Sequence, residues 1–371
     1  MKEIGIYIHI PYCKRKCYYC DFNSYAGKEE TEPEYIKTIK KEISECKYTG
    51  FNIGTIYIGG GTPSLIDSKY ITDIIAKIRE KFIVSQNAEI TIEVNPGTVN
   101  KEKLLAYKKA GVNRLSIGLQ STDNETLKKI GRVHTYEEFL RTYNIAREIG
   151  FNNINIDFMI ALPGEDEWSV AIQISEIINL KPEHISCYSL ILEDGTKLKE
   201  LVEKNELQLP DEEEERKMYW KMKELLEENG YEHYEISNFS LPGYNSRHNM
   251  DCWNQKEYLG FGASAHSYFN GKRFSNQKTI EEYISNYKNK IIEETQTQET
   301  MKKEYMMLGL RKIQGVSVSD FERKFQVNPL FYFRFEICKL VDEELIEIDL
   351  DNIKLTPKGL DVANLVWEEF I

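Results

Sequence analysis

The segment IYIHIPYCKRKCYYCDFNSY, residues 6–25, decides how the rest of the chain is interpreted. It places Cys13, Cys17 and Cys20 within eight residues of one another. Three thiolates this close in sequence can hold one soft metal centre on a single loop, because thiolate ligands select zinc, copper(I) or iron–sulfur clusters over hard cations. The segment therefore predicts a metal-binding loop, and the first question is which centre it holds.

Counting ligands separates the three kinds of site that such a loop can form. A structural zinc site needs four protein ligands, and the chain has no second CxxC and no HxxxH, while His9 in YIHI is predicted to lie in a strand. A disulfide is disfavoured because seven cysteines without a signal peptide point to a reducing compartment. A cubane cluster normally takes four cysteines. Three cysteines would leave one iron free to bind an exchangeable ligand.

Size, composition and charge narrow the class of protein. The chain has 371 residues, of which 41% are hydrophobic, and this suggests a globular protein of two or three domains. Its net charge of −12 argues against nucleic acid as a partner, because nucleic-acid binders usually show a basic face. No apolar run approaches the ~20 residues that span a bilayer. The start, MKEIGIYIHI, lacks the features of a signal peptide, and we expect a cytoplasmic protein that is not transmembrane.

Strand and helix patterns alternate through the first half of the chain. Runs rich in Ile, Val and Tyr predict strands, and longer amphipathic segments predict helices between them. Such alternation implies parallel β-α-β units, which form either an open sheet or a partial barrel. The predicted strands span residues 4–10, 55–58, 89–94, 113–119, 153–160 and 184–190, and the predicted helices span residues 33–47, 69–81, 101–110, 136–149 and 168–180.

Polar and glycine-rich motifs follow these strands at their C-terminal ends, which is where parallel barrels carry functional residues. Three glycines in YIGGGTPS, residues 57–64, would let the backbone approach a ligand closely, although a tight turn has the same signature. Glu93 ends an apolar strand, where a carboxylate is costly without a partner. Arg132 in KKIGRVH is, taken alone, more typical of a surface position. Two later strands contribute Gln120 and Asp157.

The spacing CxxxCxxC, with the aromatic Tyr19 before the third cysteine, resembles the radical S-adenosylmethionine (SAM) proteins. In that family the open iron is chelated by SAM, and an electron from the cluster breaks a carbon–sulfur bond of SAM. The resemblance implies a partial (β/α)6 TIM-type barrel, a [4Fe-4S] cluster on Cys13, Cys17 and Cys20, and an electron donor of the flavodoxin or ferredoxin type. It implies cofactor contacts from Tyr7, Tyr19, Gly60, Gly61, Thr62, Glu93, Gln120, Arg132 and Asp157.

Two further regions follow the predicted barrel, which spans residues 1–230. Residues 231–299 are rich in aromatic residues and contain His233, His248 and His266. Imidazole between aromatic walls suits a flat, metal-centred ligand, although a packed aromatic core has the same composition. In residues 300–371 a helix at 302–312, a second helix capped by Ser317 or Ser319, a third helix at 333–344 and two strands predict a winged-helix-like α+β domain. We expect this domain to act as a lid or an interaction module.

Over nearly its whole length the chain resembles the radical SAM group that contains oxygen-independent coproporphyrinogen III oxidase and the heme chaperones. The oxidases carry a further cysteine two residues after the third, where this chain has Phe22. The heme chaperones carry HNxxYW, and this chain has HNMDCW, in which His248, Asn249 and Trp253 match while Cys252 replaces the tyrosine. The resemblance implies a heme chaperone that holds heme near His248 and transfers it to an acceptor hemoprotein, with Cys252 as a second candidate ligand.

Two alternatives to a heme chaperone stay open. One is an oxidase that decarboxylates the propionates of coproporphyrinogen III by radical chemistry. The other is a metal-stabilised interaction module that does not cleave SAM. Outside the proposed site we expect His134 in a loop or helix cap, and Cys46, Cys187 and Cys338 as buried small hydrophobic residues rather than ligands.

Overall fold

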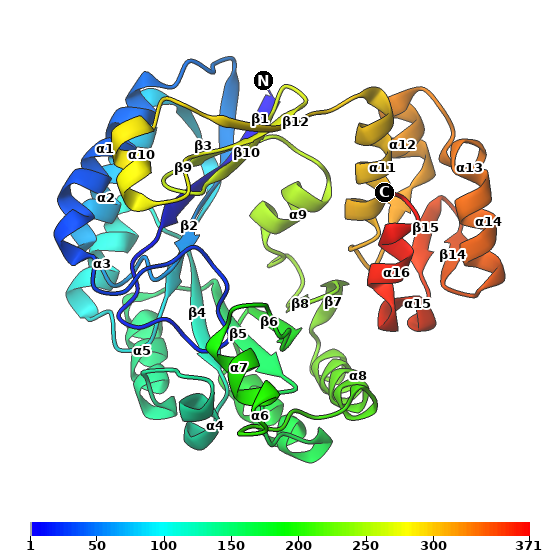
Figure 1. Ribbon diagram of the computed structural model, residues 1–371, viewed down its shortest axis with the longest axis horizontal. Coiled ribbons are helices and arrows are strands. Elements are labelled where there is room, and N and C mark those ends of the chain that lie inside the picture. Colours follow the sequence, from blue (N-terminus) through cyan, green and yellow to red (C-terminus); the bar gives the residue numbers. More distant parts are fainter. Residues whose placement is uncertain (1) are drawn as a thin grey trace.

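Six parallel strands form the centre of the fold (Figure 1). In the computed structural model, which describes residues 2–371, these strands lie side by side in chain order. They are β1 (Lys2–Ile10), β2 (Phe51–Gly60), β3 (Ile83–Val94), β4 (Arg114–Gln120), β5 (Ile154–Ile160) and β6 (His184–Ser189). The arrangement confirms the predicted α/β partial barrel, although β2 and β3 begin several residues earlier than their predicted bounds.

Helices connect the strands and cover the outer face of the barrel (Figure 1). Each amphipathic helix buries one apolar stripe; in the first, Ile36, Ile39 and Ile43 lie three or four residues apart and are buried. Their bounds are η1 (Glu29–Thr31), α1 (Glu32–Glu45), α2 (Ser68–Lys81), α3 (Lys101–Ala110), α4 (Asn124–Lys129), α5 (Tyr136–Ile149), α6 (Glu167–Asn179), α7 (Lys197–Glu203) and α8 (Glu212–Glu228).

The two faces of the six strands differ sharply in polarity. Ile4, Ile6 and Ile8 of β1 are fully buried in the main hydrophobic core, together with the apolar stripes of the helices. Because side chains alternate along a strand, the positions between them face the inside of the barrel, here called the lumen. The polar residues at these lumen positions are Tyr7, His9, Thr55, Tyr57, Glu89, Thr91, Glu93, Arg114, Ser116, Asn155, Asp157, His184, Ser186 and Tyr188.

Residues 231–299 extend the sheet at both of its edges. At one edge β8 (Asn238–Ser240) pairs antiparallel with β6, and β7 (Glu232–Glu235) pairs with β8. At the other edge β9 (Tyr258–Phe261) pairs parallel with β1, and it is followed by β10 (His266–Phe269), β11 (Lys272–Ser275) and β12 (Ile291–Thr295). The helices of this region are α9 (Arg247–Trp253) and α10 (Ile280–Asn286). Several of its aromatic residues, such as Phe261 and Tyr283, belong to the main core.

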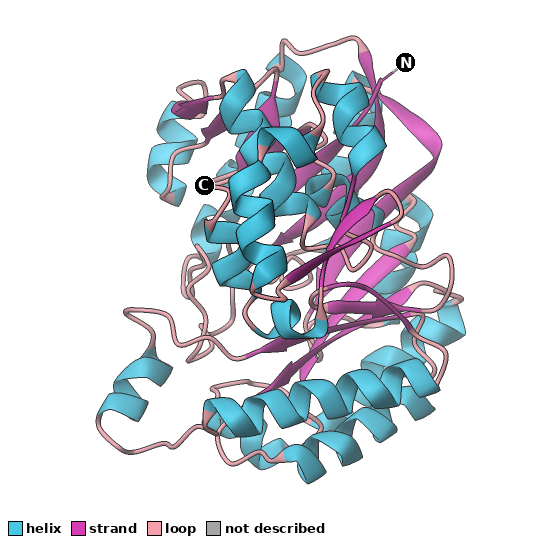
Figure 2. Ribbon diagram, turned by 90° about the vertical axis from the view of Figure 1, so that its right-hand side faces the viewer, coloured by secondary structure: helices cyan, strands magenta, loops and turns pink. Residues whose placement is uncertain are grey.

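The C-terminal region has a core of its own, and Figure 2 views the molecule from the side of this domain. Its helices are α11 (Gln298–Gly309), α12 (Val318–Phe325), α13 (Pro329–Tyr332), α14 (Arg334–Asp342), α15 (Pro357–Asp361) and α16 (Ala363–Glu368). Three antiparallel strands form the predicted wing, one more than expected: β13 (Val316–Ser317), β14 (Ile346–Asp349) and β15 (Asn352–Leu355). Ser317, rather than Ser319, caps α12, because its side chain accepts a hydrogen bond from the Asp320 N–H.

Several single-residue expectations can be compared with the structure. Cys187 is buried as predicted, and Cys46 is half-buried at the end of α1. The expectation for Cys338 was wrong, because this thiol lies on the exposed side of α14. His134 lies in the loop before α5, where Thr135 is the capping residue. No helix within residues 2–371 combines the length and the apolar character needed to cross a membrane.

Candidate functional site

A cavity of about 280 Å³ opens beside the cysteine loop, at the C-terminal ends of the parallel strands. The structure brings together in its wall most of the residues that the sequence predicts for the site: Cys13, Cys17, Tyr19, Cys20, Gly60, Gly61, Thr62, Glu93, Gln120, Arg132 and Asp157. Tyr7 and His248 are not in the wall.

The same wall contains residues that sequence reasoning missed. Tyr57, Ser116 and Tyr188 occupy lumen positions of β2, β4 and β6, and Asn95 directly follows β3. Alternation within their own strands was the available signal, because Tyr57 and Ser116 each stand between two apolar residues. Asn95 carried a weaker signal, its position in the turn sequence EVNPG.

Close backbone packing holds the cysteine loop against the end of β2. The N–H of Gly61 donates to the Ile10 carbonyl at 2.8 Å, and the N–H of Thr62 donates to the Tyr12 carbonyl at 2.7 Å. A Cβ atom at Gly61 would lie 2.8 Å from the Tyr12 carbonyl oxygen and 3.0 Å from the Cys13 Sγ. Gly61 therefore permits a close approach between two loops of the protein, whereas the sequence analysis expected the glycines to approach a ligand.

Arg132 lies inside the pocket rather than on the surface. Its Nη2 donates to Asn95 Oδ1 at 2.9 Å and to the Gly118 carbonyl at 2.8 Å, and its Nη1 lies 3.6 Å from Cys17 Sγ. Its Nε–H is buried and has no partner within residues 2–371. A guanidinium with a free N–H beside the cysteines is suited to an anionic ligand group.

Two carboxylates form the polar floor of the pocket. Glu93 accepts hydrogen bonds from the Tyr57 hydroxyl at 2.9 Å and the Gly60 N–H at 3.1 Å. Burial, with a smaller effect of the Asp157 charge, raises the pKa of Glu93 to about 7. Asp157 accepts from Ser116 Oγ at 3.1 Å, and burial raises its pKa as well. Glu93 is therefore only partly ionised near neutral pH in the unliganded pocket.

The end of β4 adopts an unusual backbone conformation at the pocket. Gln120 has a φ of 72°, in the left-handed region, and its Oε1 accepts from the Tyr188 hydroxyl at 3.1 Å. A residue without glycine's freedom rarely adopts this conformation, and such outliers concentrate at functional sites. The turn places the Gln120 side chain in the pocket wall.

The predicted [4Fe-4S] cluster requires a different arrangement of the three cysteines from that of a single metal ion. Within residues 2–371 no three His, Cys, Asp or Glu side chains are arranged around a single ion position. In a cubane each cysteine binds a different iron, so the sulfurs stand further apart. All three cysteines line one pocket, and burial raises the pKa of Cys13 and Cys20. Their thiolates therefore need a positive centre, which a cluster would supply.

His248 lies deeper in the lumen, behind the pocket wall. Its ring stacks on Tyr57 with centroids 5.3 Å apart, and its Nδ1 is 2.8 Å from Thr55 Oγ1. The side chain is 8% exposed, and burial, with the charge of Arg114, lowers the pKa of its imidazole to about 4. The ring is therefore neutral at physiological pH. Tyr7 also stacks on Tyr57, with centroids 6.3 Å apart, and its hydroxyl is 2.9 Å from His9 Nδ1.

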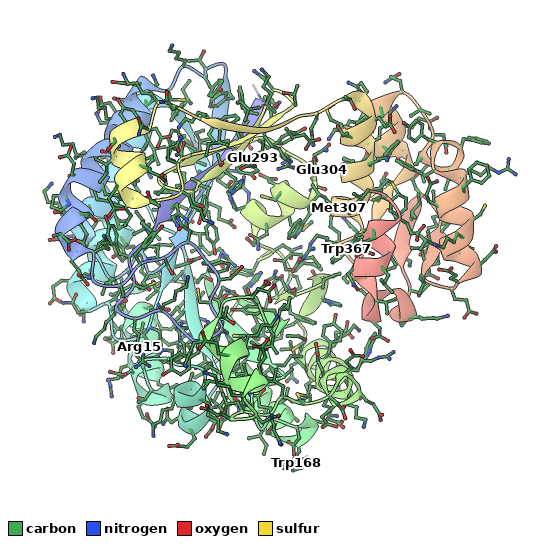
Figure 3. All side chains as sticks on the ribbon, in the orientation of Figure 1. Arg15, Trp168, Glu293, Glu304, Met307 and Trp367 are labelled. Carbon is green, nitrogen blue, oxygen red and sulfur yellow. The ribbon has the colours of Figure 1, made fainter. Side chains whose placement is uncertain are left out.

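The other end of the HNMDCW segment contacts the C-terminal domain. The Arg311 guanidinium lies between the rings of Trp253, on α9, and Trp367, on α16, at 4.4 Å from each centroid. Figure 3 shows Trp367 and Glu304 on the side of the domain that faces the barrel. Burial raises the pKa of Cys252 to about 12, so this thiol stays protonated at neutral pH. It is not a preformed thiolate ligand.

A half-barrel that carries three cysteines after its first strand and polar groups at its strand ends defines a radical SAM protein. The family model of the radical SAM superfamily matches residues 7–172, and that of the HemN C-terminal domain matches residues 296–362. Membership of the superfamily implies a [4Fe-4S] cluster and SAM. Within it, the chain belongs to the family of the heme chaperone HemW.

The similarity to this family extends over almost the full length of both aligned chains. The chain is 36% identical to the heme chaperone HemW of Lactococcus lactis, covering 100% of this chain and 98% of that one. It is 37% identical to the HemW of Bacillus subtilis, covering 98% of each. The solved structure of coproporphyrinogen III oxidase (HemN) from Escherichia coli aligns with a TM-score of 0.86 at 22% identity, covering 100% of this chain and 90% of that chain. This last likeness concerns the fold.

Proposed function

We propose that the protein is a heme chaperone of the radical SAM type. In this proposal Cys13, Cys17 and Cys20 hold a [4Fe-4S] cluster, SAM occupies the pocket beside them, and His248 binds heme for transfer to an acceptor hemoprotein. The observation that carries the proposal is the state of His248: a neutral imidazole in the lumen whose Nδ1 is anchored on Thr55. Family membership supports it independently.

The pocket residues take distinct roles in holding the cofactors. When bound, the cluster and SAM supply reductive cleavage of a carbon–sulfur bond. Arg132 offers its free Nε–H to a carboxylate. Gly60, Gly61 and Thr62 line the pocket, and because their N–H groups are bonded within the protein, they would offer carbonyl oxygens to the amino group of SAM. The floor formed by Glu93 and Asp157 offers acceptors to hydroxyl groups. The family resemblance also implies SAM contacts from Gln120, Tyr19 and Tyr7.

The surroundings of His248 resemble those of a metal-binding histidine. Such histidines usually bond one ring nitrogen to the protein, which fixes the ring and leaves the other nitrogen for the metal. Here Thr55 fixes Nδ1, and Nε2 has no hydrogen-bond partner in residues 2–371. Because the ring is only 8% exposed, a porphyrin reaches Nε2 after movement of the segments that cover it. Cys252 is the weaker candidate, since its thiol is protonated.

A heme titration of anaerobically purified protein tests the proposed role of His248. We expect His248→Ala to weaken heme binding at least tenfold without changing the iron content of the cluster. His233→Ala is the matched control, because His233 is a buried histidine stacked on Phe239 outside the lumen. Heme affinity that is the same in His248→Ala and the wild type would remove His248 from the site.

Two assays separate the chaperone from the alternatives. With SAM, reductant and coproporphyrinogen III, formation of protoporphyrinogen would identify an oxidase and reject the chaperone; Phe22 in place of the oxidase cysteine argues against this outcome. With SAM and reductant alone, release of 5′-deoxyadenosine would eliminate a module that does not cleave SAM.

The electron is proposed to come from an acidic flavodoxin or ferredoxin, since Lys14, Arg15 and Lys16 of the cysteine loop are exposed (Figure 3 labels Arg15).

A further inference from the structure

One cation in the lumen has no partner. Arg114 begins β4, and its side chain is 2% exposed. Within residues 2–371 its guanidinium makes no hydrogen bond, ion pair or aromatic stacking contact, and its Nε–H is completely buried. Thr91, which is opposite Arg114 in the register of β3 and β4, likewise has a buried Oγ1 without a partner. An unpaired buried guanidinium is costly, so its presence requires a reason.

The neighbouring polar groups do not supply that partner. His184 is bonded to Asn155 Oδ1 at 2.6 Å through Nδ1 and to the Tyr234 hydroxyl at 2.7 Å through Nε2. Glu89, the carboxylate next to Thr55 in the register, accepts from the backbone N–H groups of residues 247 and 248 at 3.1 Å each. Asp157 accepts from Ser116 and Asn155. Apart from Thr91, these side chains around Arg114 are thus bonded to one another or to the backbone.

Strand alternation and register place Arg114 in the lumen. Arg114 is in register with Thr91 of β3, which is in register with Tyr57 of β2, and the ring of His248 stacks on that tyrosine. In agreement with this position, the pKa of His248 and that of His184 are lowered by burial and further by the Arg114 charge. Arg114 shares the lumen with the unpartnered Nε2 of His248. A guanidinium presents a planar fork of N–H groups that matches a carboxylate.

We propose that Arg114 is the carboxylate-binding residue of the lumen, and that its ligand is a propionate of the heme held by His248. This inference rests on the proposed function. Heme combines an iron atom, which requires an imidazole, with two carboxylates, which require cations if they are to be buried. His248 meets the first requirement, and Arg114 meets the second with a charge that no protein group neutralises by direct contact.

The experiment compares heme with its dimethyl ester, which keeps the iron but caps both propionates. Both ligands are titrated into the wild-type protein, Arg114→Met and Arg247→Gln. We expect Arg114→Met to weaken heme binding roughly 10- to 100-fold, as the loss of a charged hydrogen bond implies, and to leave ester binding unchanged. Arg247→Gln is the matched control, because Arg247 precedes His248 but directs its guanidinium to the Asn87 carbonyl. An equal effect of Arg114→Met on both ligands, or no effect, would overturn the proposal.

Thermal unfolding of the ligand-free variants tests whether Arg114 has a structural role instead. Removing an unpaired buried charge should leave the Tm unchanged or raise it. A fall of the Tm in Arg114→Met would mark Arg114 as part of the folded framework and would also reject the inference. His248→Ala keeps the two proposals apart. If His248→Ala binds both heme and the ester like the wild type, the proposed function fails. The role of Arg114 is tested separately, by whether Arg114→Met weakens the binding of heme more than the binding of the ester.

Discussion

At the scale of single residues, the pocket depends on groups whose environment differs from what their type suggests. Arg132, a residue type that usually lies on the surface, is buried beside Cys17 and bonded to Asn95. Gly61 has no room for a Cβ atom against the cysteine loop. The sequence predicted the cysteines, the glycines and Arg132 through a motif. It did not predict Arg114 or Tyr57, because their roles depend on which side of a strand they face and on which groups lie across the lumen.

Glu93 gives the folded protein a specific pH dependence. Its pKa, raised to about 7 from 4.5, means that the folded protein holds a proton that the unfolded chain releases between these pH values. The contribution of Glu93 to the free energy of unfolding therefore falls as the pH rises from about 4.5 to 7 and stays low above that. Relative to the wild type, Glu93→Gln should gain stability over this range, by up to roughly 3 kcal/mol.

Denaturant unfolding of the ligand-free protein at pH 5 and pH 8 measures this difference for Glu93→Gln. Glu102→Gln is the control, since Glu102 is exposed on α3 and should show the same stability difference from the wild type at both pH values. A Glu93→Gln difference that does not change with pH would mean that Glu93 is ionised throughout.

At the scale of elements, helix α9 is the link between the barrel and the C-terminal domain (Figure 1). Its first turn carries His248, and its last residue, Trp253, contacts Arg311. The alternation of strands and helices up to residue 190 was predictable, because the spacing of apolar residues within each short segment indicates a strand or a helix. Strands β7 to β12 were not predicted. They are short, and β9 pairs with β1, about 250 positions away, which no local pattern encodes.

Arg311 is predicted to hold α9 and α16 together. Two aromatic rings at 4.4 Å contribute roughly 2 kcal/mol through cation–π interaction at a largely desolvated site. Arg311→Ala should therefore loosen the C-terminal domain, and limited proteolysis should cut faster in the connection between β12 and α11, at residues 296–297. Lys302→Ala is the control, because Lys302 lies over Tyr332 within the domain itself. Equal cleavage rates in the two variants would contradict a role of Arg311 at this interface.

At the scale of the whole molecule, residues 2–371 form two large hydrophobic cores and one smaller cluster around Leu162. The main core joins residues 4–287, and the second lies within residues 305–370. Polar and backbone contacts connect them, such as the hydrogen bond from the Ile236 N–H to the Arg311 carbonyl at 3.1 Å and that from Gln255 to Glu304 at 2.7 Å. The composition suggested more than one domain, but it could not indicate that residues 231–299 share the core of the barrel.

Separate cores predict separate responses to core mutations. Phe321→Ala removes a fully buried ring from the second core and should lower the stability of that domain by about 3 to 5 kcal/mol. Scanning calorimetry should then show one transition moved to lower temperature while the other is retained. Phe139→Ala, a fully buried ring in the main core, should move the other transition. A single transition that both variants shift equally would indicate one cooperative unit.

The pairing of β1 with β9 also has a consequence during synthesis on the ribosome. Strand β1 leaves the exit tunnel well before its partner at Tyr258–Phe261, which emerges after about 250 more residues, and this takes roughly 10 to 50 s at about 5 to 20 residues per second. Throughout that interval one side of an isoleucine-rich strand has unsatisfied backbone groups and can associate with other nascent chains. Productive folding in the cell should therefore depend on holdase chaperones that shield the N-terminus until translation is nearly complete.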